Sequence, residues 1–157
     1  MSAPVRVATS EGQGATISLL MFRVGSELFA LDLASVEEAV EFPALHGVPT
    51  RERHLRGVVD WRGRLLPVYS PSRVLGLESA ADAITLVLRD GERHVGLAVD
   101  EVEDVLELAA GQLRPAPVRG AAEPVLTGLV RHEGALVAIL DAAALVEGCA
   151  VTSQEES

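Results

Sequence analysis

The chain has 157 residues, of which 48% are hydrophobic and only 3% aromatic, and its formal net charge is −10. This length predicts one domain, or two small lobes that share an aliphatic core. The hydrophobic fraction excludes a disordered protein, and the acidic charge argues against nucleic-acid binding, because phosphate backbones would be repelled.

The two ends of the chain predict flexible segments and no membrane insertion. Residues 1–16 are polar and are expected to form an arm, whereas residues 149–157 are expected to form a polar tail. The N-terminus lacks the apolar core of a signal peptide, and no stretch approaches the roughly 20 apolar residues of a membrane span. With one cysteine, Cys149, no internal disulfide can form, so we expect a cytoplasmic protein.

The first half of the chain, about residues 17–80, reads as strands with short helices. Apolar runs predict two strands that turn at Gly25, and Leu55–Pro71 predicts two more that turn at Gly63. Ser35 followed by Glu38 is a capping-box pattern that predicts a helix between these hairpins. A second helix is expected to begin after Ser70, the cap, with Pro71 in its first turn and Gly76 as its stop.

The second half, about residues 84–148, repeats this order. At a shift of 66 positions Val36 matches Val102, and at a shift of 71 Gly57 matches Gly128 and Gly63 matches Gly134. Asp100 again predicts the start of a short helix, and Asp141 predicts the last one, which should stop at Gly148. Residues 17–148 are therefore expected to form a single domain built from two pseudo-repeats. The predicted fold is mainly β, with two similar five-stranded, barrel-like, SH3-like subdomains and short helices.

The residues that could carry chemistry form no recognisable catalytic or metal-binding set. The four histidines, His46, His54, His94 and His132, lack the three-to-five spacing of zinc ligands. No phosphate-binding loop and no Gly-x-Ser-x-Gly elbow is present. We therefore expect no enzyme activity, no metal and no cofactor.

The hairpin tip at Trp61-Arg62-Gly63 is the most informative stretch, because Trp61 is the only tryptophan. The corresponding positions of the second half hold His132 and Glu133, so the turn does not itself require this pair. In one interpretation Trp61 covers the end of the core and Arg62 pairs with a neighbouring acid. In the other, the pair is a protein-binding hot spot, because Trp and Arg are enriched at the centres of interfaces.

Several segments in the right order resemble the CheW-like domain, the adaptor of bacterial chemosensory arrays. They are VGSELFALDLASVEEAV, GVVDWRGRLLPV, VGLAVDEVEDVLEL, QLRPAP and LTGLVRHEGALVAILD. The resemblance covers about residues 17–146. It departs from the family pattern at Asp60-Trp61, where the family usually has Asn and an aliphatic residue, and at Tyr69-Ser70-Pro71.

The resemblance implies two similar subdomains around a groove and a function without chemistry. The partners would be the cytoplasmic tip of a methyl-accepting chemoreceptor and the regulatory domain of a CheA-type histidine kinase, at membrane-associated arrays. The receptor-binding surface it implies falls on Val36 and Glu38 of the first predicted helix, Gly57 of the strand before the hairpin tip, and Arg62 of the tip. We expect Trp61 and Gly63, the neighbours of Arg62, to belong to the same receptor-binding surface. It does not place the kinase-binding residues.

A different class of function is open on the residues alone. A small-molecule-binding β-domain, or a minor hydrolase, could use the groove between the lobes, with His54, Asp60 and Tyr69 as candidate polar groups. Sequence spacing does not bring these three together.

Overall fold

The structure of the protein is a computed structural model. It describes residues 16–42, 45–47, 54–72, 74–77, 83–115 and 125–149. The predicted N-terminal arm and C-terminal tail lie outside these ranges, apart from Thr16 and Cys149.

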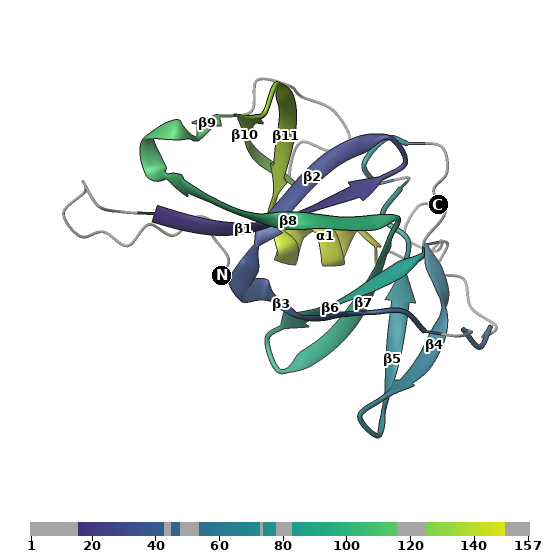
Figure 1. The fold of residues 1–157 in the computed structure, drawn as a ribbon. Coiled ribbons are helices and arrows are strands. Elements are labelled where there is room, and N and C mark those ends of the chain that lie inside the picture. The colour runs from purple at the N-terminus through teal and green to yellow at the C-terminus, as the bar shows by residue number, and fades with distance from the viewer. Residues whose placement is uncertain are drawn as a thin grey trace.

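Two mixed β-sheets, in which most strand pairs are antiparallel, make up most of the described chain (Figure 1). The strands of sheet A are, in spatial order, β8 (Glu101–Ala109), β1 (Thr16–Val24), β2 (Glu27–Asp32), β11 (Ala135–Leu140), β10 (Leu126–His132) and the short β9 (Arg114–Pro115). The strands of sheet B are β3 (Val36–Val40), β6 (Ile84–Asp90), β7 (Arg93–Val99), β5 (Arg64–Tyr69) and β4 (Leu55–Trp61). The remaining elements are the 3-10 turns η1 (Leu33–Ser35) and η2 (Ala110–Gln112) and the helix α1 (Ala142–Cys149).

Each sheet combines strands from both halves of the sequence. The β1–β2 hairpin pairs with β8 on one side and, in parallel, with β11 on the other. The β6–β7 hairpin pairs in the same way with β3 and, in parallel, with β5. The order β8-β1-β2-β11-β10 thus corresponds strand for strand to β3-β6-β7-β5-β4. The prediction of a mainly β chain with two similar sheets is confirmed, although sheet A carries β9 as a sixth strand.

The two corresponding hairpin turns each place a charged residue and then a glycine at positive φ. In the β4–β5 turn Arg62 and Gly63 have φ of 53° and 79°, and in the β10–β11 turn Glu133 and Gly134 have φ of 52° and 82°. Two consecutive positive φ values in a two-residue loop are typical of a type I′ turn, whose twist matches that of the paired strands. The two turns therefore share one backbone conformation.

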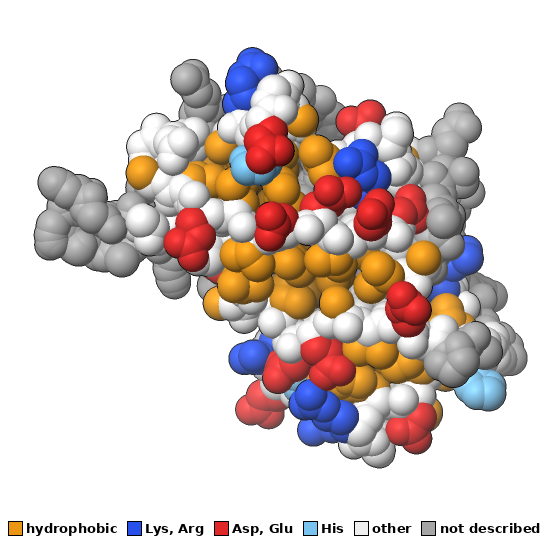
Figure 2. Space-filling view, viewed as in Figure 1, with side chains coloured by type: hydrophobic (Ala, Val, Ile, Leu, Met, Phe, Trp, Pro, Cys, Tyr) orange, Lys and Arg blue, Asp and Glu red, His pale blue; other side chains and the backbone are white. Residues whose placement is uncertain are grey.

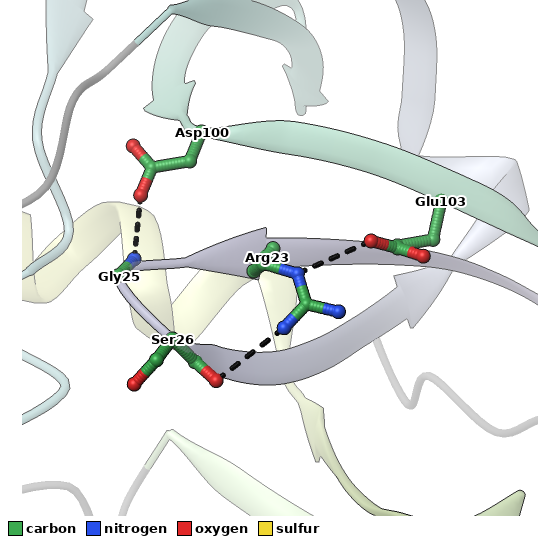
Figure 3. A network of polar contacts seen from close by, with 5 residues as sticks. All are labelled: Arg23, Gly25, Ser26, Asp100 and Glu103. Atoms are coloured by element: carbon green, nitrogen blue, oxygen red, sulfur yellow. Dashed lines mark hydrogen bonds and ion pairs between the residues drawn. The ribbon is translucent and has the colours of Figure 1, made fainter.

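The helices predicted after Ser35 and Asp100 are wrong, because β3 and β8 occupy those positions. Two aspartates near these positions cap turns. Asp32 accepts a hydrogen bond from the Ala34 amide at 3.1 Å, within η1. The Asp100 carboxylate accepts one from the Gly25 amide at 2.6 Å and so caps the β1–β2 turn (Figure 3). Both segments are strands because β3 pairs with β6 and β8 pairs with β1. This tertiary pairing overrides the local helix signal.

Next to this cap an ion pair joins β1 to β8. Arg23 Nε lies 3.2 Å from Glu103 Oε2, and Arg23 Nη1 also donates to the Ser26 carbonyl at 3.4 Å (Figure 3). Arg89 and Glu37 make the equivalent pair between β6 and β3 in sheet B, at 2.9 Å. Both pairs link the outer strand of a sheet to its neighbour.

The two predicted terminal helices have different outcomes. After Asp141, α1 forms as predicted: Asp141 Oδ1 accepts from the amides of Ala143 and Ala144 at 3.1 and 3.5 Å, and the helix ends one residue beyond Gly148. In the described part of 71–77 the chain makes turns, with the Leu75 amide donating to the Pro71 carbonyl at 3.0 Å. The helix predicted after Ser70 is therefore wrong over those residues.

The principal core lies where the two sheets and α1 meet. It combines Phe22 of β1, Leu88 of β6, Leu97 of β7 and Leu145 of α1, all fully or almost fully buried. Each sheet also encloses a smaller hydrophobic cluster of its own. The cluster of sheet A includes Ile139, and that of sheet B includes Trp61. The core is aliphatic, as the composition predicted.

Candidate functional site

The tip of the β4–β5 hairpin contacts the opposite edge of sheet B. Arg62 Nη2 lies 2.6 Å from Oε1 of Glu38, which projects from β3. Since β3 and β4 are the two outermost strands of this sheet, the ion pair shows that the sheet is strongly rolled. Arg62 and Glu38, which are 24 positions apart in sequence, therefore form one surface site.

Trp61 lies beneath this site and is buried. Only 6% of its surface is exposed, and it packs in the sheet B cluster with Leu66 and Val87. Partly buried Val40 of β3 joins the same cluster. The structure thus matches the interpretation in which Trp61 covers the end of the core. Trp61 therefore contributes to the surface only indirectly, through the Arg62 side chain that packs on its ring.

Arg62 rests on that ring. Its guanidinium carbon lies 4.6 Å from the ring centroid of Trp61, a distance typical of a cation–π contact. Asp60 accepts a hydrogen bond from the Gly63 amide at 3.2 Å and fixes the turn from the other side. The tip is therefore held by a buried ring, an ion pair and a turn-capping carboxylate.

A second polar group, the imidazole of His94, packs against the Trp61 ring. The His94 and Trp61 rings have centroids 4.9 Å apart at an interplanar angle of 49°. His94 Nε2 lies 3.5 Å from Glu37 Oε1, and Arg89 Nη2 lies 2.9 Å from the same oxygen. Contacts between neighbouring residues thus cross sheet B from Arg62 to Arg89.

Gly57 is brought to a different part of the sheet and has a structural reason to be glycine. Its φ is +153°, at a bulge in β4 where the register shifts between Leu55 and Gly57. A Cβ on this residue would lie 2.7 Å from the carbonyl oxygen of His46, which pairs with Val58 through an isolated bridge. A side chain at Gly57 would therefore push away the segment that covers the outer edge of β4.

An apolar band crosses the face of the molecule between β8 and β3. Figure 2 shows it as a run of hydrophobic side chains below a row of acidic ones. Exposed large side chains on these segments include Val105 of β8, 44% exposed, and Leu33 at the start of η1, 36% exposed. Val36, the first residue of β3, is half-buried against the principal core. Val36 and Glu38 therefore connect the apolar band to the charged tip.

Sequence reasoning missed Val105 because the residues after Asp100 were interpreted as a helix, and it did not single out Leu33. On a strand, Val105 shares a face with Glu107, whereas the bulge in β8 opposite Met21 and Phe22 places Glu101 on the other face. An apolar residue at Val105, between the acids Asp104 and Glu107, was the available signal, and it is informative only once β8 is assigned as a strand.

A cavity of about 350 Å³ opens where β5 and β7 diverge. These parallel strands pair only at Val68 with Gly96 and at Tyr69 with Leu97. Residues lining the cavity include Trp61, Arg64, Leu65, Tyr69, Arg93 and His94. Of the three polar candidates for a ligand site, only Tyr69 lines it, so the structure does not bring His54 and Asp60 together with Tyr69 there.

Metal binding and thiol chemistry find no support among the described residues. Within them no three His, Cys, Asp or Glu side chains are placed to hold a metal ion. Burial raises the pKa of the Cys149 thiol to about 12, so it stays protonated and is a poor nucleophile. In the same part of the chain, no helix has the length and hydropathy needed to cross a membrane.

Comparisons with known proteins agree with this architecture. The family model of the CheW-like domain matches residues 18–149. A chemotaxis protein CheW of Klebsiella aerogenes is 31% identical over 82% of this chain and 81% of its own length. One from Thermotoga maritima is 30% identical over 82% and 87%. The crystal structure of a scaffolding protein from Thermoanaerobacter tengcongensis, TtCheW, superposes with a TM-score of 0.75 at 21% identity, over 83% of this chain and 92% of that one.

Proposed function

The chain belongs to the CheW-like domain family, and on that premise we propose that it is a non-catalytic adaptor that couples chemoreceptors to a CheA-type histidine kinase. It would act in the cytoplasm, at membrane-associated receptor arrays that control chemotaxis or a related motility pathway. The observation that carries the proposal is the family match over nearly the whole described chain, joined to a surface suited to a helical partner.

The receptor-binding surface we propose is the apolar band with the charged tip beside it. The cytoplasmic tip of a methyl-accepting chemoreceptor is a coiled coil, and one of its helices could lay an apolar stripe along Leu33, Val36 and Val105. Amphipathic helices dock in this way, with apolar anchors in the middle and charges at the rim. Glu38 and Arg62 would supply the charged rim at one end.

The other proposed site residues support this surface from below. Trp61 lies under Arg62, and Gly63 permits the turn that carries it. Gly57 would act by shaping the outer edge of β4, since it is buried beneath the segment around His46. We propose the regulatory domain of the kinase as the second partner, at a surface separate from this one.

The alternative, a small-molecule-binding domain, is supported only by the cavity between β5 and β7. A thermal-shift screen with metals and metabolites tests it, because a ligand that binds only the native state raises the melting temperature. A clear, saturable shift from a metabolite would favour the alternative.

The adaptor proposal is tested by a pull-down from the native lysate, read by mass spectrometry, with three baits. They are the wild type, Arg62→Glu, and Glu133→Arg as a matched charge reversal at the equivalent turn. The wild type and Glu133→Arg should both recover a histidine kinase and a chemoreceptor. Arg62→Glu should keep the kinase and lose the receptor, because it sets a negative charge against Glu38 and removes the cation from the proposed rim.

Two outcomes would contradict the proposal at different levels. If the wild type recovers neither partner, the adaptor function fails. If Arg62→Glu keeps the receptor as well as the wild type does, the assigned receptor surface is wrong. Circular dichroism of each bait checks that the fold is intact, which we expect because the Arg62 side chain is 61% exposed.

A further inference from the structure

We propose that Trp61 is a positioning residue: its buried indole is a rigid platform that holds the Arg62 guanidinium in the orientation in which a partner meets it. This inference rests on the proposed function, because the partner in question is the chemoreceptor tip. It goes beyond that function by assigning a task to a side chain that is itself hardly exposed.

The platform is rigid because the ring is packed on several sides. It is 6% exposed, lies in the sheet B cluster with Val59, Leu66 and Val68, and touches the His94 ring. A ring enclosed in this way has few alternative rotamers, since protein cores are densely packed. Its position is therefore fixed before any partner binds.

The indole nitrogen does not explain why a tryptophan stands here. Trp61 Nε1 is buried and has no hydrogen-bond partner among the described residues. What the ring offers Arg62 is therefore its π-face and its area. A phenylalanine at this position would keep a π-face without losing a hydrogen bond, whereas a leucine would keep much of the apolar volume and lose the face.

Arg62 is constrained at three points although its side chain is 61% exposed. Its backbone φ is 53°, its guanidinium carbon lies 4.6 Å from the Trp61 ring centroid, and its Nη2 lies 2.6 Å from Glu38 Oε1. An exposed arginine normally loses considerable side-chain freedom when it binds. Here most of that loss has already occurred in the free protein, and such preorganisation increases affinity.

The equivalent turn shows that the backbone does not need this platform. Glu133 has nearly the same φ as Arg62, 52° against 53°, but its side chain is 82% exposed and its Oε2 lies 3.6 Å from Nε2 of the neighbouring His132. The stack of Arg62 on Trp61 is therefore a side-chain arrangement added to one of two similar hairpins. Its benefit should be sought in binding.

The test is a double-mutant cycle in binding to a purified, soluble coiled-coil fragment of the chemoreceptor tip. The variants are Trp61→Leu, Trp61→Phe, Arg62→Ala and the double variant Trp61→Leu/Arg62→Ala. Trp61→Leu should weaken binding about two- to fivefold, the range expected for an exposed cation–π contact. Trp61→Phe should restore most of the affinity, and Trp61→Leu should have no further effect once Arg62 is alanine.

A merely structural tryptophan would give a different pattern. Loss of stability alone does not change affinity while the protein remains folded, so each variant is measured well below its melting temperature. If Trp61→Leu binds as tightly as the wild type, or weakens Arg62→Ala as much as it weakens the wild type, the inference is overturned.

Fluorescence separates this inference from the proposed function. Trp61 is the only tryptophan, so the emission of the free protein reports on this ring alone. Arg62→Ala should shift the emission to the red, because water reaches the face that the guanidinium covered, and an unchanged spectrum would contradict the platform. If the red shift occurs but the wild type does not bind the receptor fragment, the proposed function fails and the positioning role fails with it.

Discussion

The β4–β5 and β10–β11 hairpin tips have the same backbone and different side-chain environments. Both place two positive-φ residues between paired strands, with glycine second. In the first tip, Trp61 is buried under an arginine that reaches across to β3. In the second, His132 and Glu133 contact each other. The comparison teaches that the fold sets the turn, whereas the side chains decide whether a tip becomes part of a site.

The sharpest test of this difference is truncation at the first position of each turn. Trp61→Ala removes a ring from the sheet B cluster and should lower the free energy of unfolding by about 3–5 kcal/mol. His132→Ala removes a half-buried side chain outside the core clusters and should cost less than about 1 kcal/mol. Urea denaturation of both variants measures the contrast, and equal losses would show that the two tips are energetically alike.

Two glycines at the outer edge of β4 give a second contrast, because one is in close contact with its neighbours and the other is not. Gly57 lies at a bulge in this strand. Gly57→Ala should cost about 2–4 kcal/mol, because its Cβ would lie 2.7 Å from the His46 carbonyl oxygen and its φ is +153°. Gly47→Ala is the control, since nothing lies within 4 Å of the added Cβ. If Gly57→Ala left the melting temperature unchanged, the segment at His46 would be able to move away from the added Cβ at little energetic cost.

The ends of the two halves differ as well, since α1 has only a turn as its counterpart. Cys149 of α1 is buried, with its sulfur 3.9 Å from the Ser70 carbonyl oxygen, and burial raises its pKa to about 12. In the unfolded chain the thiol has a pKa of about 8.5. Between these values the folded protein holds one proton more than the unfolded chain, so stability should fall as pH rises.

This pH effect is measurable as a difference between two proteins. From pH 9 to 11 the wild type should lose about 1.4 kcal/mol per pH unit more than Cys149→Ala does, the value for a single proton. Urea unfolding at several pH values gives both slopes. Parallel slopes would show that the thiol is accessible to water in the folded protein.

The smallest effect should fall equally on the two turns. Gly63 and Gly134 have φ of 79° and 82°, and neither has an atom within 4 Å of an added Cβ. Alanine at either position should therefore cost about 1 kcal/mol, from backbone conformation alone. Thermal or urea unfolding tests this, and a difference of more than about 0.5 kcal/mol would contradict the equivalence of the two backbones.

Much of the fold was predictable because turns and apolar runs are local signals. The Gly63 and Gly134 turns, the flanking strands and the cap at Asp141 are all found where the sequence indicated. The helices expected after Ser35 and Asp100 failed because strand pairing is nonlocal: β3 joins β6, and β8 joins β1. A capping pattern spans only a few residues, so it carries no information about a partner strand tens of residues away.

The sequence named candidate residues for the site but not their arrangement. The family resemblance implied Arg62 and Glu38, and only the rolled sheet shows that they touch. Sequence alone left open whether Trp61 is exposed or buried, because either state suits a large aromatic residue at a hairpin tip. Val105 was missed, since its exposure depends on β8 being the outer strand of sheet A.

The exchange of hairpins between the sheets has a consequence for how the protein is made. On the ribosome the β1–β2 hairpin emerges first, yet its neighbours β8 and β11 are complete only at Ala109 and Leu140. Sheet B has all of its strands once Val99 has been synthesised. A domain generally folds as a unit, and the principal core joins residues of both sheets and of α1. Sheet B can therefore bury its share of that core only after β10, β11 and α1 have also been synthesised.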